Sequence, residues 1–74
     1  MLFSERLNFL REKNNYTKSE LAEKIGITRM SYFRYEKGKR LPTYEILLQM
    51  ADIFDVSVDY LMCRTDYPKV THKQ

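Results

Sequence analysis

The chain has 74 residues, a formal net charge of +3 and a single cysteine. A chain this short forms one domain that buries only roughly 60% of its unfolded surface, which excludes a large core. One cysteine excludes an internal disulfide and favours a reducing compartment. No apolar run approaches the ~20 residues of a membrane span, and the N-terminus lacks the apolar core of a signal peptide.

Charges of opposite sign are separated along the sequence. Residues 11–40 contain nine Lys or Arg and four Glu, whereas residues 41–66 contain one Arg and five Asp or Glu. One half of the domain is therefore basic and the other half acidic. A polyanion is attracted to the first half and repelled by the second, which orients the two molecules before contact.

The first predicted helix follows Ser4, whose hydroxyl suits an N-cap, and has Glu5 in its first turn. Arg11 lies at the edge of the buried stripe. Asn14 and Asn15 end the helix, because asparagine tolerates the left-handed conformation. The buried side chains of this helix are predicted to be Phe3, Leu7 and Leu10.

The second predicted helix covers residues 18–25. Thr17 is its N-cap, and Glu20, three residues later, completes a capping box. Gly26 ends the helix, because glycine enters the left-handed region at little cost. Its buried stripe consists of Leu21, Ala22 and Ile25.

The third predicted helix covers residues 28–36 and begins at Thr28, only two residues after Gly26. A helix that restarts so soon crosses its predecessor steeply, which is the helix-turn-helix arrangement. Tyr32 and Tyr35 form the inward side. The opposite side has no acidic residue, and it suits the anionic major groove of DNA with its thymine methyl groups. Its members are Arg29, Met30, Phe33, Arg34 and Lys37.

The fourth predicted helix begins after Pro42, with Thr43 as its cap, and ends at Asp55. Ser57 caps a fifth helix, predicted to cover about residues 58–63. The domain therefore covers residues 1–64, and residues 65–74 form an extended or disordered tail. The predicted buried stripe of the fourth helix is Tyr44, Leu47, Leu48, Ala51 and Phe54.

The stretch TKSELAEKIGITRMSYFRYEKGKRLP resembles the helix-turn-helix of the phage repressor and Cro family, also called the XRE family. The later stretch TYEILLQMADIFDVSVDYL resembles the family's fourth and fifth helices, so the likeness covers about residues 3–63. It implies an all-α fold, a compact five-helix domain of the lambda-repressor type. It also implies a bacterial or phage-encoded cytoplasmic repressor that binds double-stranded DNA sequence-specifically, as a dimer on a palindromic operator.

The candidate base-reading residues lie on the third helix. The family's contact positions correspond to Thr28, Arg29, Met30 and Arg34. Each arginine can donate two hydrogen bonds to guanine, and Met30 and Phe33 can cover thymine methyls. Phosphate contact alone remains an alternative for the arginines, and packing on the domain's own core is an alternative for Phe33, which departs from the family's small or polar residue.

Five residues are candidates for contact with phosphates, with a merely solvated basic surface as the alternative. They are Thr17, Lys18, Lys37, Lys39 and Arg40. Lys18 stands where the family commonly has glutamine. The resemblance also implies a structural ion pair between Arg11 and Glu36, which would fix the third helix against the first.

The remaining chemistry is sparse. Cys63 and His72 are the only residues of metal-ligand or nucleophile type, and both zinc sites and cysteine nucleophiles need further groups nearby. We therefore expect no enzyme activity, no metal, no cofactor and no small-molecule ligand.

Two questions stay open at the level of sequence. A homodimer through the fifth helix and the tail is expected to use Tyr60, Met62, Tyr67 and Val70, whereas the alternative is a monomer with a frayed end. An alternative function is an adaptor or antitoxin-like module that binds another protein through residues 41–66. The chain can also be the DNA-binding part of a longer regulator.

Overall fold

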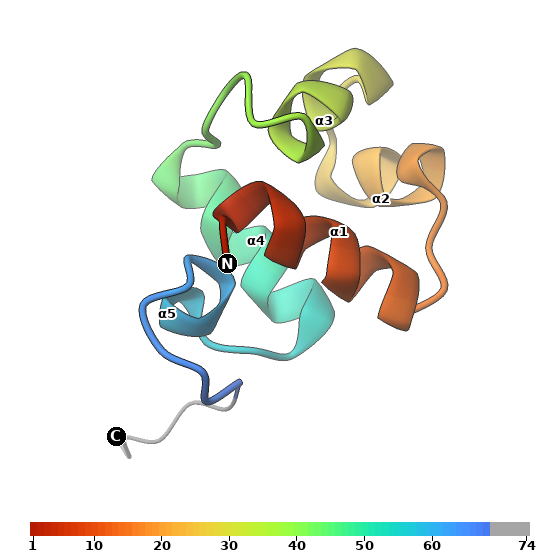
Figure 1. The fold of residues 1–74 in the computed structure, drawn as a ribbon. Helices are drawn as coiled ribbons and strands as arrows, with labels where there is room; N and C mark the ends of the chain where they lie inside the picture. The colour runs from red at the N-terminus through yellow and green to blue at the C-terminus, as the bar shows by residue number, and fades with distance from the viewer. Residues whose placement is uncertain (69–74) are drawn as a thin grey trace.

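The computed structural model describes residues 1–68, which form five helices connected by turns and short loops (Figure 1). The helices are α1 (Phe3–Lys13), α2 (Lys18–Ile25), α3 (Arg29–Glu36), α4 (Tyr44–Phe54) and α5 (Val58–Leu61). The predicted all-α, five-helix architecture is confirmed. Within residues 1–68, every helix is too short or too polar to traverse a lipid bilayer.

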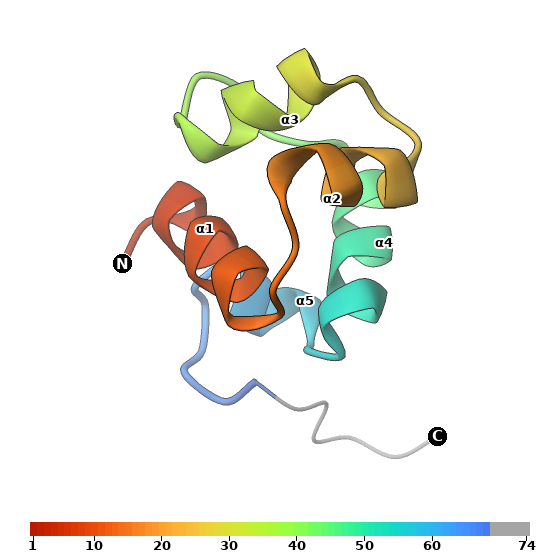
Figure 2. The same cartoon turned by 90° about the vertical axis from the view of Figure 1, so that its right-hand side faces the viewer.

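The helices are arranged so that α3 and α5 lie at opposite ends of the molecule, with α1 and α4 between them (Figures 1 and 2). Helix α3 packs on both α1 and α2, and α5 packs on α1 and α4. Two elements thus support α3 on its inner side. Its remaining surface forms one end of the domain.

Side-chain caps define the starts of four helices, as the sequence predicts. The hydroxyl oxygens of Thr17, Thr28, Thr43 and Ser57 each accept a hydrogen bond from the backbone N–H three residues later. Each cap satisfies an N–H that the helix itself leaves without a partner. The predicted helix ends are also confirmed at Gly26 (φ +90°) and Asp55 (φ +57°), and Asn15 (φ +62°) turns the chain after α1.

The prediction that Ser4 caps the first helix is wrong. Helix α1 begins two residues earlier than predicted, at Phe3, and its N-cap is Leu2. The carboxylate of Glu5 accepts a 2.9 Å hydrogen bond from the N–H of Leu2, which satisfies the terminal donor without a hydroxyl. Phe3 packs against the core from this first turn.

The fifth helix is shorter than predicted, because it ends at Leu61 rather than Cys63. Cys63 has φ +66° and reverses the direction of the chain. The following residues then return towards α1, where the carbonyl of Thr65 meets the side chain of Arg6.

The buried stripe of α4 differs from the prediction in three side chains. Tyr44 is 69% exposed and Leu48 is 39% exposed, whereas Met50, which the prediction omits, is fully buried. The stripe that meets the core is Leu47, Met50, Ala51 and Phe54. These residues follow the helical period as well as the predicted set does, but they face α2 and α5.

Among the described residues, Arg6 is the one charged residue that is buried as a whole, and the sequence gives no indication of it. Its guanidinium lies over the ring of Tyr60, 3.9 Å from the centroid, and donates to the carbonyl oxygens of Tyr60 (2.8 Å) and Thr65 (3.1 Å). An exposed carboxylate, that of Asp66, lies 3.4 Å away. Arg6 therefore holds the segment after α5 against α1.

Candidate nucleic-acid interface

Helix α3 presents two sides of opposite character. Tyr32 and Tyr35 are buried against α1 and α2, as predicted. The opposite side is open: Arg29 and Arg34 are exposed, and Met30 is 57% exposed. A helix of eight residues with two exposed arginines and bare hydrocarbon between them offers hydrogen-bond donors and apolar contact on one surface.

The start of α3 is placed by the turn that follows α2. Gly26 takes the left-handed conformation, and the N–H of Ile27 donates to the carbonyl of Ala22 at 3.0 Å. Thr28 then caps α3 through the N–H of Ser31. Thr28 is itself exposed at the end of the helix, beside Arg29. These contacts fix where the exposed side of α3 begins.

Arg29 has a contact that the sequence does not predict. Its Nη1 donates a 3.1 Å hydrogen bond to Oγ of Ser19, on the first turn of α2. The two residues are ten positions apart, and only the steep crossing of α2 and α3 brings them together. The hydrogen bond is exposed, so water or a ligand can replace it at small cost.

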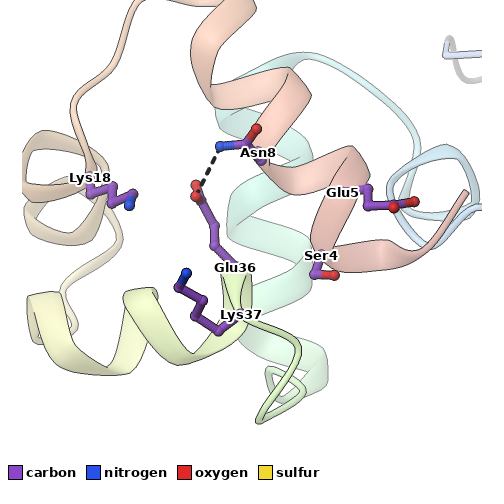
Figure 3. A pocket seen from close by; sticks show the side chains of 6 residues that line it. All are labelled: Ser4, Glu5, Asn8, Lys18, Glu36 and Lys37. Carbon is purple, nitrogen blue, oxygen red and sulfur yellow. Dashed lines mark hydrogen bonds between the residues drawn. The ribbon is translucent and has the colours of Figure 1, made fainter.

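The end of α3 is tied to α1 through Glu36. Nε of Arg11 lies 2.6 Å from Oε2 of Glu36, and Nδ2 of Asn8 donates to Oε1 at 3.1 Å (Figure 3). The hydroxyl of Tyr32 also donates to Oε2. Nη1 of Arg11 donates to the carbonyl of Tyr16 at 2.9 Å, which joins the loop before α2 to the same cluster. One carboxylate therefore connects α3 to α1.

The electrostatics of this cluster favour the charged form of Glu36. Burial alone would raise the pKa of Glu36, but the hydrogen bonds from Arg11, Tyr32 and Asn8 and the charge of Arg11 outweigh burial, so the pKa is lowered. Burial and the neighbouring carboxylate raise the pKa of Tyr32, so its hydroxyl stays protonated and keeps donating. Although burial opposes it, the contact with Glu36 raises the pKa of Arg11.

Asn8 and Tyr32 are partners of Glu36 that sequence reasoning missed. Asn8 lies three residues before Arg11, so helical spacing places both on one side of α1 and could have indicated a common partner. Tyr32 lies four residues before Glu36 on α3, but its ring is needed for the core, and the sequence does not show that its hydroxyl reaches the carboxylate.

The candidate phosphate-binding residues surround α3 in two groups. The first group is at the start of α2, where Thr17 is the exposed cap and Lys18 the first helical residue. The second group follows α3 and consists of Lys37, directly after the helix, and of the exposed loop residues Lys39 and Arg40. Lys18 and Lys37 line one open pocket of about 270 Å³ with Ser4, Glu5, Asn8 and Glu36, and Figure 3 shows both lysines there. The structure thus brings basic groups from α2 and α3 together.

Phe33 does not fold back onto the core. Its side chain is partly exposed, at 37%, and the ammonium groups of Lys18 and Lys37 lie 5.4 Å and 5.3 Å from the centroid of its ring. Both distances are within the range of cation–π attraction.

The residues expected in a dimer surface have different environments. Met62 is 44% exposed and Tyr67 is 73% exposed, whereas Tyr60 is half-buried beneath Arg6. Val70 lies outside the described residues, as does His72. Cys63 is half-buried. Residues 1–68 contain no group of three His, Cys, Asp or Glu side chains arranged to hold a metal ion.

Comparison with known proteins places the chain in a family. The family model described as helix-turn-helix matches residues 7–61. The uncharacterized HTH-type transcriptional regulator YqaE of Bacillus subtilis is 44% identical over 61 residues, which are 82% of this chain and 53% of that protein. The cryptic phage CTXphi transcriptional repressor RstR of Vibrio cholerae is 42% identical over 64 residues, which are 86% of this chain and 57% of that protein.

A solved structure supports the same assignment. The crystal structure of the P22 c2 repressor protein in complex with a synthetic operator matches with a TM-score of 0.79 and 26% identity, covering 84% of this chain and 94% of that one. This chain spans little more than half the length of the two curated relatives. It belongs to the phage repressor and Cro-type, or XRE, family of helix-turn-helix proteins, which are DNA-binding transcription regulators.

Proposed function

We propose that this chain binds double-stranded DNA sequence-specifically and acts as a transcriptional repressor, with α3 in the major groove and α2 across the backbone. The observation that carries the proposal is the open side of α3. Arg29, Met30 and Arg34 are exposed there while Tyr32 and Tyr35 are buried on the other side. Guanidinium groups pair with guanine edges, and a methionine suits a thymine methyl. Thr28 completes the base-reading set at the start of the helix.

The basic groups around α3 are proposed to bind the backbone. Thr17 and Lys18 would contact a phosphate at the start of α2, where the helix dipole also favours an anion. Lys37, Lys39 and Arg40 would contact phosphates beyond the end of α3. These contacts fix the orientation of α3 on the duplex but carry no sequence information. The pair Arg11 and Glu36 would keep α3 at a fixed angle to α1 and thus to the phosphates.

We further propose a homodimer on a palindromic operator, with half-sites about 34 Å apart. Support comes from two exposed apolar side chains at the α5 end, those of Met62 and Tyr67. The other two expected contact residues are Tyr60, which is half-buried beneath Arg6, and Val70, which lies outside the described residues. The variant Met62→Glu/Tyr67→Glu should shift the sedimentation coefficient of a dimer to that of a monomer. An unchanged coefficient would place the dimer contact elsewhere.

The test of DNA binding begins with selection of bound duplexes from a random pool. The selected duplex is then titrated with the unaltered protein and with Arg29→Ala/Arg34→Ala. Loss of both arginines should weaken specific binding by roughly 10-fold or more, since each bidentate contact contributes about 1–3 kcal/mol of discrimination. Circular dichroism should show an unchanged fold, because both side chains are exposed.

A control of equal charge is Lys13→Ala/Lys24→Ala, which removes two positive charges from exposed positions outside the proposed interface. It should retain the sequence preference. No role as an enzyme is proposed. If the unaltered protein selects no duplex, the alternative becomes an adaptor or antitoxin-like module, whose candidate surface is the acidic segment 41–66.

A further inference from the structure

Phe33 on α3 lies near two lysines from different elements. Lys18 belongs to the first turn of α2 and Lys37 to the end of α3, and their Nζ atoms lie 5.4 Å and 5.3 Å from the centre of the Phe33 ring. An aromatic ring attracts ammonium groups through its negative face, and two such contacts restrict the long, flexible lysine side chains. The ring is therefore a common contact for two ammonium groups from different elements.

Neither lysine is neutralised within the domain. Among residues 1–68, no carboxylate forms an ion pair with Lys18 or Lys37. Glu36 lines the same pocket, but its oxygens already accept from Asn8, as Figure 3 shows, and also from Arg11 and Tyr32.

The N-terminus of α2 adds a third source of positive potential at Lys18, since a helix N-terminus carries a partial positive charge. This arrangement is unfavourable on its own and favourable beside an anion. It brings two ammonium groups, held from two helices, to one open pocket beside the proposed reading side of α3.

We propose that Phe33 is a positioning residue, which sets Lys18 and Lys37 for contact with the DNA backbone and does not itself read a base. The inference rests on the proposed DNA-binding function. Phe33 lies four residues before Lys37 on α3 and faces the first turn of α2, whereas Arg29, Met30 and Arg34 remain exposed and able to meet base edges. The anion in question is the phosphate of a duplex.

The two roles of Phe33 differ in what its removal changes. Removal of a base-reading residue weakens binding only to the duplex that carries the base it contacts. Removal of a positioning residue weakens binding to all duplexes alike and makes binding less dependent on salt, because fewer phosphates are neutralised.

The experiment measures Kd for two duplexes, one selected from a random pool and one unrelated, at several salt concentrations. Phe33→Ala should weaken binding to both by the same factor, roughly five-fold. The slope of log K against log salt should become shallower by up to about 2 for each bound domain. Phe33→Tyr, which keeps the ring, should retain both the affinity and the slope.

A double-mutant cycle separates positioning from any direct contact. In the background Lys18→Gln/Lys37→Gln, Phe33→Ala should have no further effect, because the groups it positions are absent. The matched control is Phe9→Ala on α1, which removes another exposed ring beside a lysine, 5.8 Å from Nζ of Lys13. This control should leave Kd and slope unchanged.

Three outcomes would overturn the assignment. Weakening by Phe33→Ala that is confined to the selected duplex, or a changed preferred base on repeated selection, would make Phe33 a base reader. Equal affinities of Phe33→Ala and the unaltered protein would also refute the positioning role. If the unaltered protein binds neither duplex, the proposed function fails and this role fails with it, whereas the other results refute the role of Phe33 alone.

Discussion

Nε of Arg11 on α1 lies 2.6 Å from Oε2 of Glu36 at the last residue of α3, and both side chains are almost fully buried. The contact joins the first helix to the helix that is proposed to read DNA. Because Asn8 and Tyr32 donate to the same carboxylate, the side chain of Glu36 is held in one orientation. The orientation of α3 is therefore coupled to α1 by a single charged group.

Removal of Arg11 should be costly. In Arg11→Ala, the buried carboxylate of Glu36 keeps two neutral donors but loses its counter-charge, and breaking a buried pair in this way costs roughly 3–5 kcal/mol. Urea unfolding followed by circular dichroism should show the destabilisation. Glu12→Ala is the control, because Glu12 meets Arg11 only at 3.8 Å on the exposed side. A destabilisation no larger than that of the control would contradict the importance of the pair.

Stability should fall in acid because of Glu36. The pKa of Glu36 is lowered in the folded protein, so below the ordinary value of about 4.3 the unfolded chain takes up a proton first. Its contribution is complete above that value and is lost as the pH falls through the folded pKa. Urea midpoints measured between pH 7 and pH 3 should fall less steeply for Glu36→Gln. An equal slope in both proteins would show that other carboxylates determine the acid limb.

Stability should also fall in alkali, for the opposite reason. Burial, followed by the carboxylate of Glu36, raises the pKa of Tyr32 in the folded protein. Above about pH 10 the unfolded chain loses the phenolic proton while the folded chain keeps it, so unfolding is favoured. In Tyr32→Phe, the urea midpoint should fall less steeply between pH 9 and pH 11. Tyr44→Phe, at an exposed site, should leave the decline in place.

Arg6 should contribute to stability through the segment after α5. Arg6→Ala leaves the carbonyl oxygen of Thr65 without its donor, at a cost of about 1–3 kcal/mol, whereas the carbonyl of Tyr60 keeps the N–H of Cys63. Amide chemical shifts of residues 60–68 should change, and the urea midpoint should fall. Asp66→Ala should have little effect, because the carboxylate of Asp66 is fully exposed. Shifts confined to α1 would argue against a role in holding this segment.

The loop after α3 should affect the salt dependence of DNA binding and not its specificity. With about 6 phosphates neutralised by a pair of domains, log K should fall with log salt at a slope of about −5. Lys39→Ala or Arg40→Ala should each make the slope shallower by about 0.9 for every phosphate that is no longer neutralised, while the selected motif stays unchanged. A changed motif would move the residue from the phosphate-binding set to the base-reading set.

Much of the fold follows from short-range chemistry. The caps at Thr17, Thr28, Thr43 and Ser57 and the turn at Gly26 each depend on residues within four positions, so the sequence contains all the information needed. The start of α1 differs from the prediction because the helix begins before Ser4, where the carboxylate of Glu5 accepts from the N–H of Leu2 and Phe3 packs against the core.

Long-range features are harder to predict. The periodicity of α4 allows both Leu48 and Met50 as core residues, and the position of α2 and α5 selects Met50. Arg6 could not be placed because its acceptors lie more than fifty residues away. For the site, periodicity places Arg29 and Arg34 on the outer side of α3, but the distances from Lys18 and Lys37 to Phe33 depend on how α2 crosses α3.

The contacts of Arg6 have a consequence for synthesis of the chain. Its carbonyl acceptors on Tyr60 and Thr65 are 54 and 59 positions later, so the guanidinium can form neither of these two hydrogen bonds until almost the whole domain has left the ribosome. Contacts of such high sequence separation close late, because the entropy of a long loop must be lost first. The smallest piece that folds stably should therefore extend beyond α5, to Asp66 at least, and a chain cut after Cys63 should be proteolysed readily.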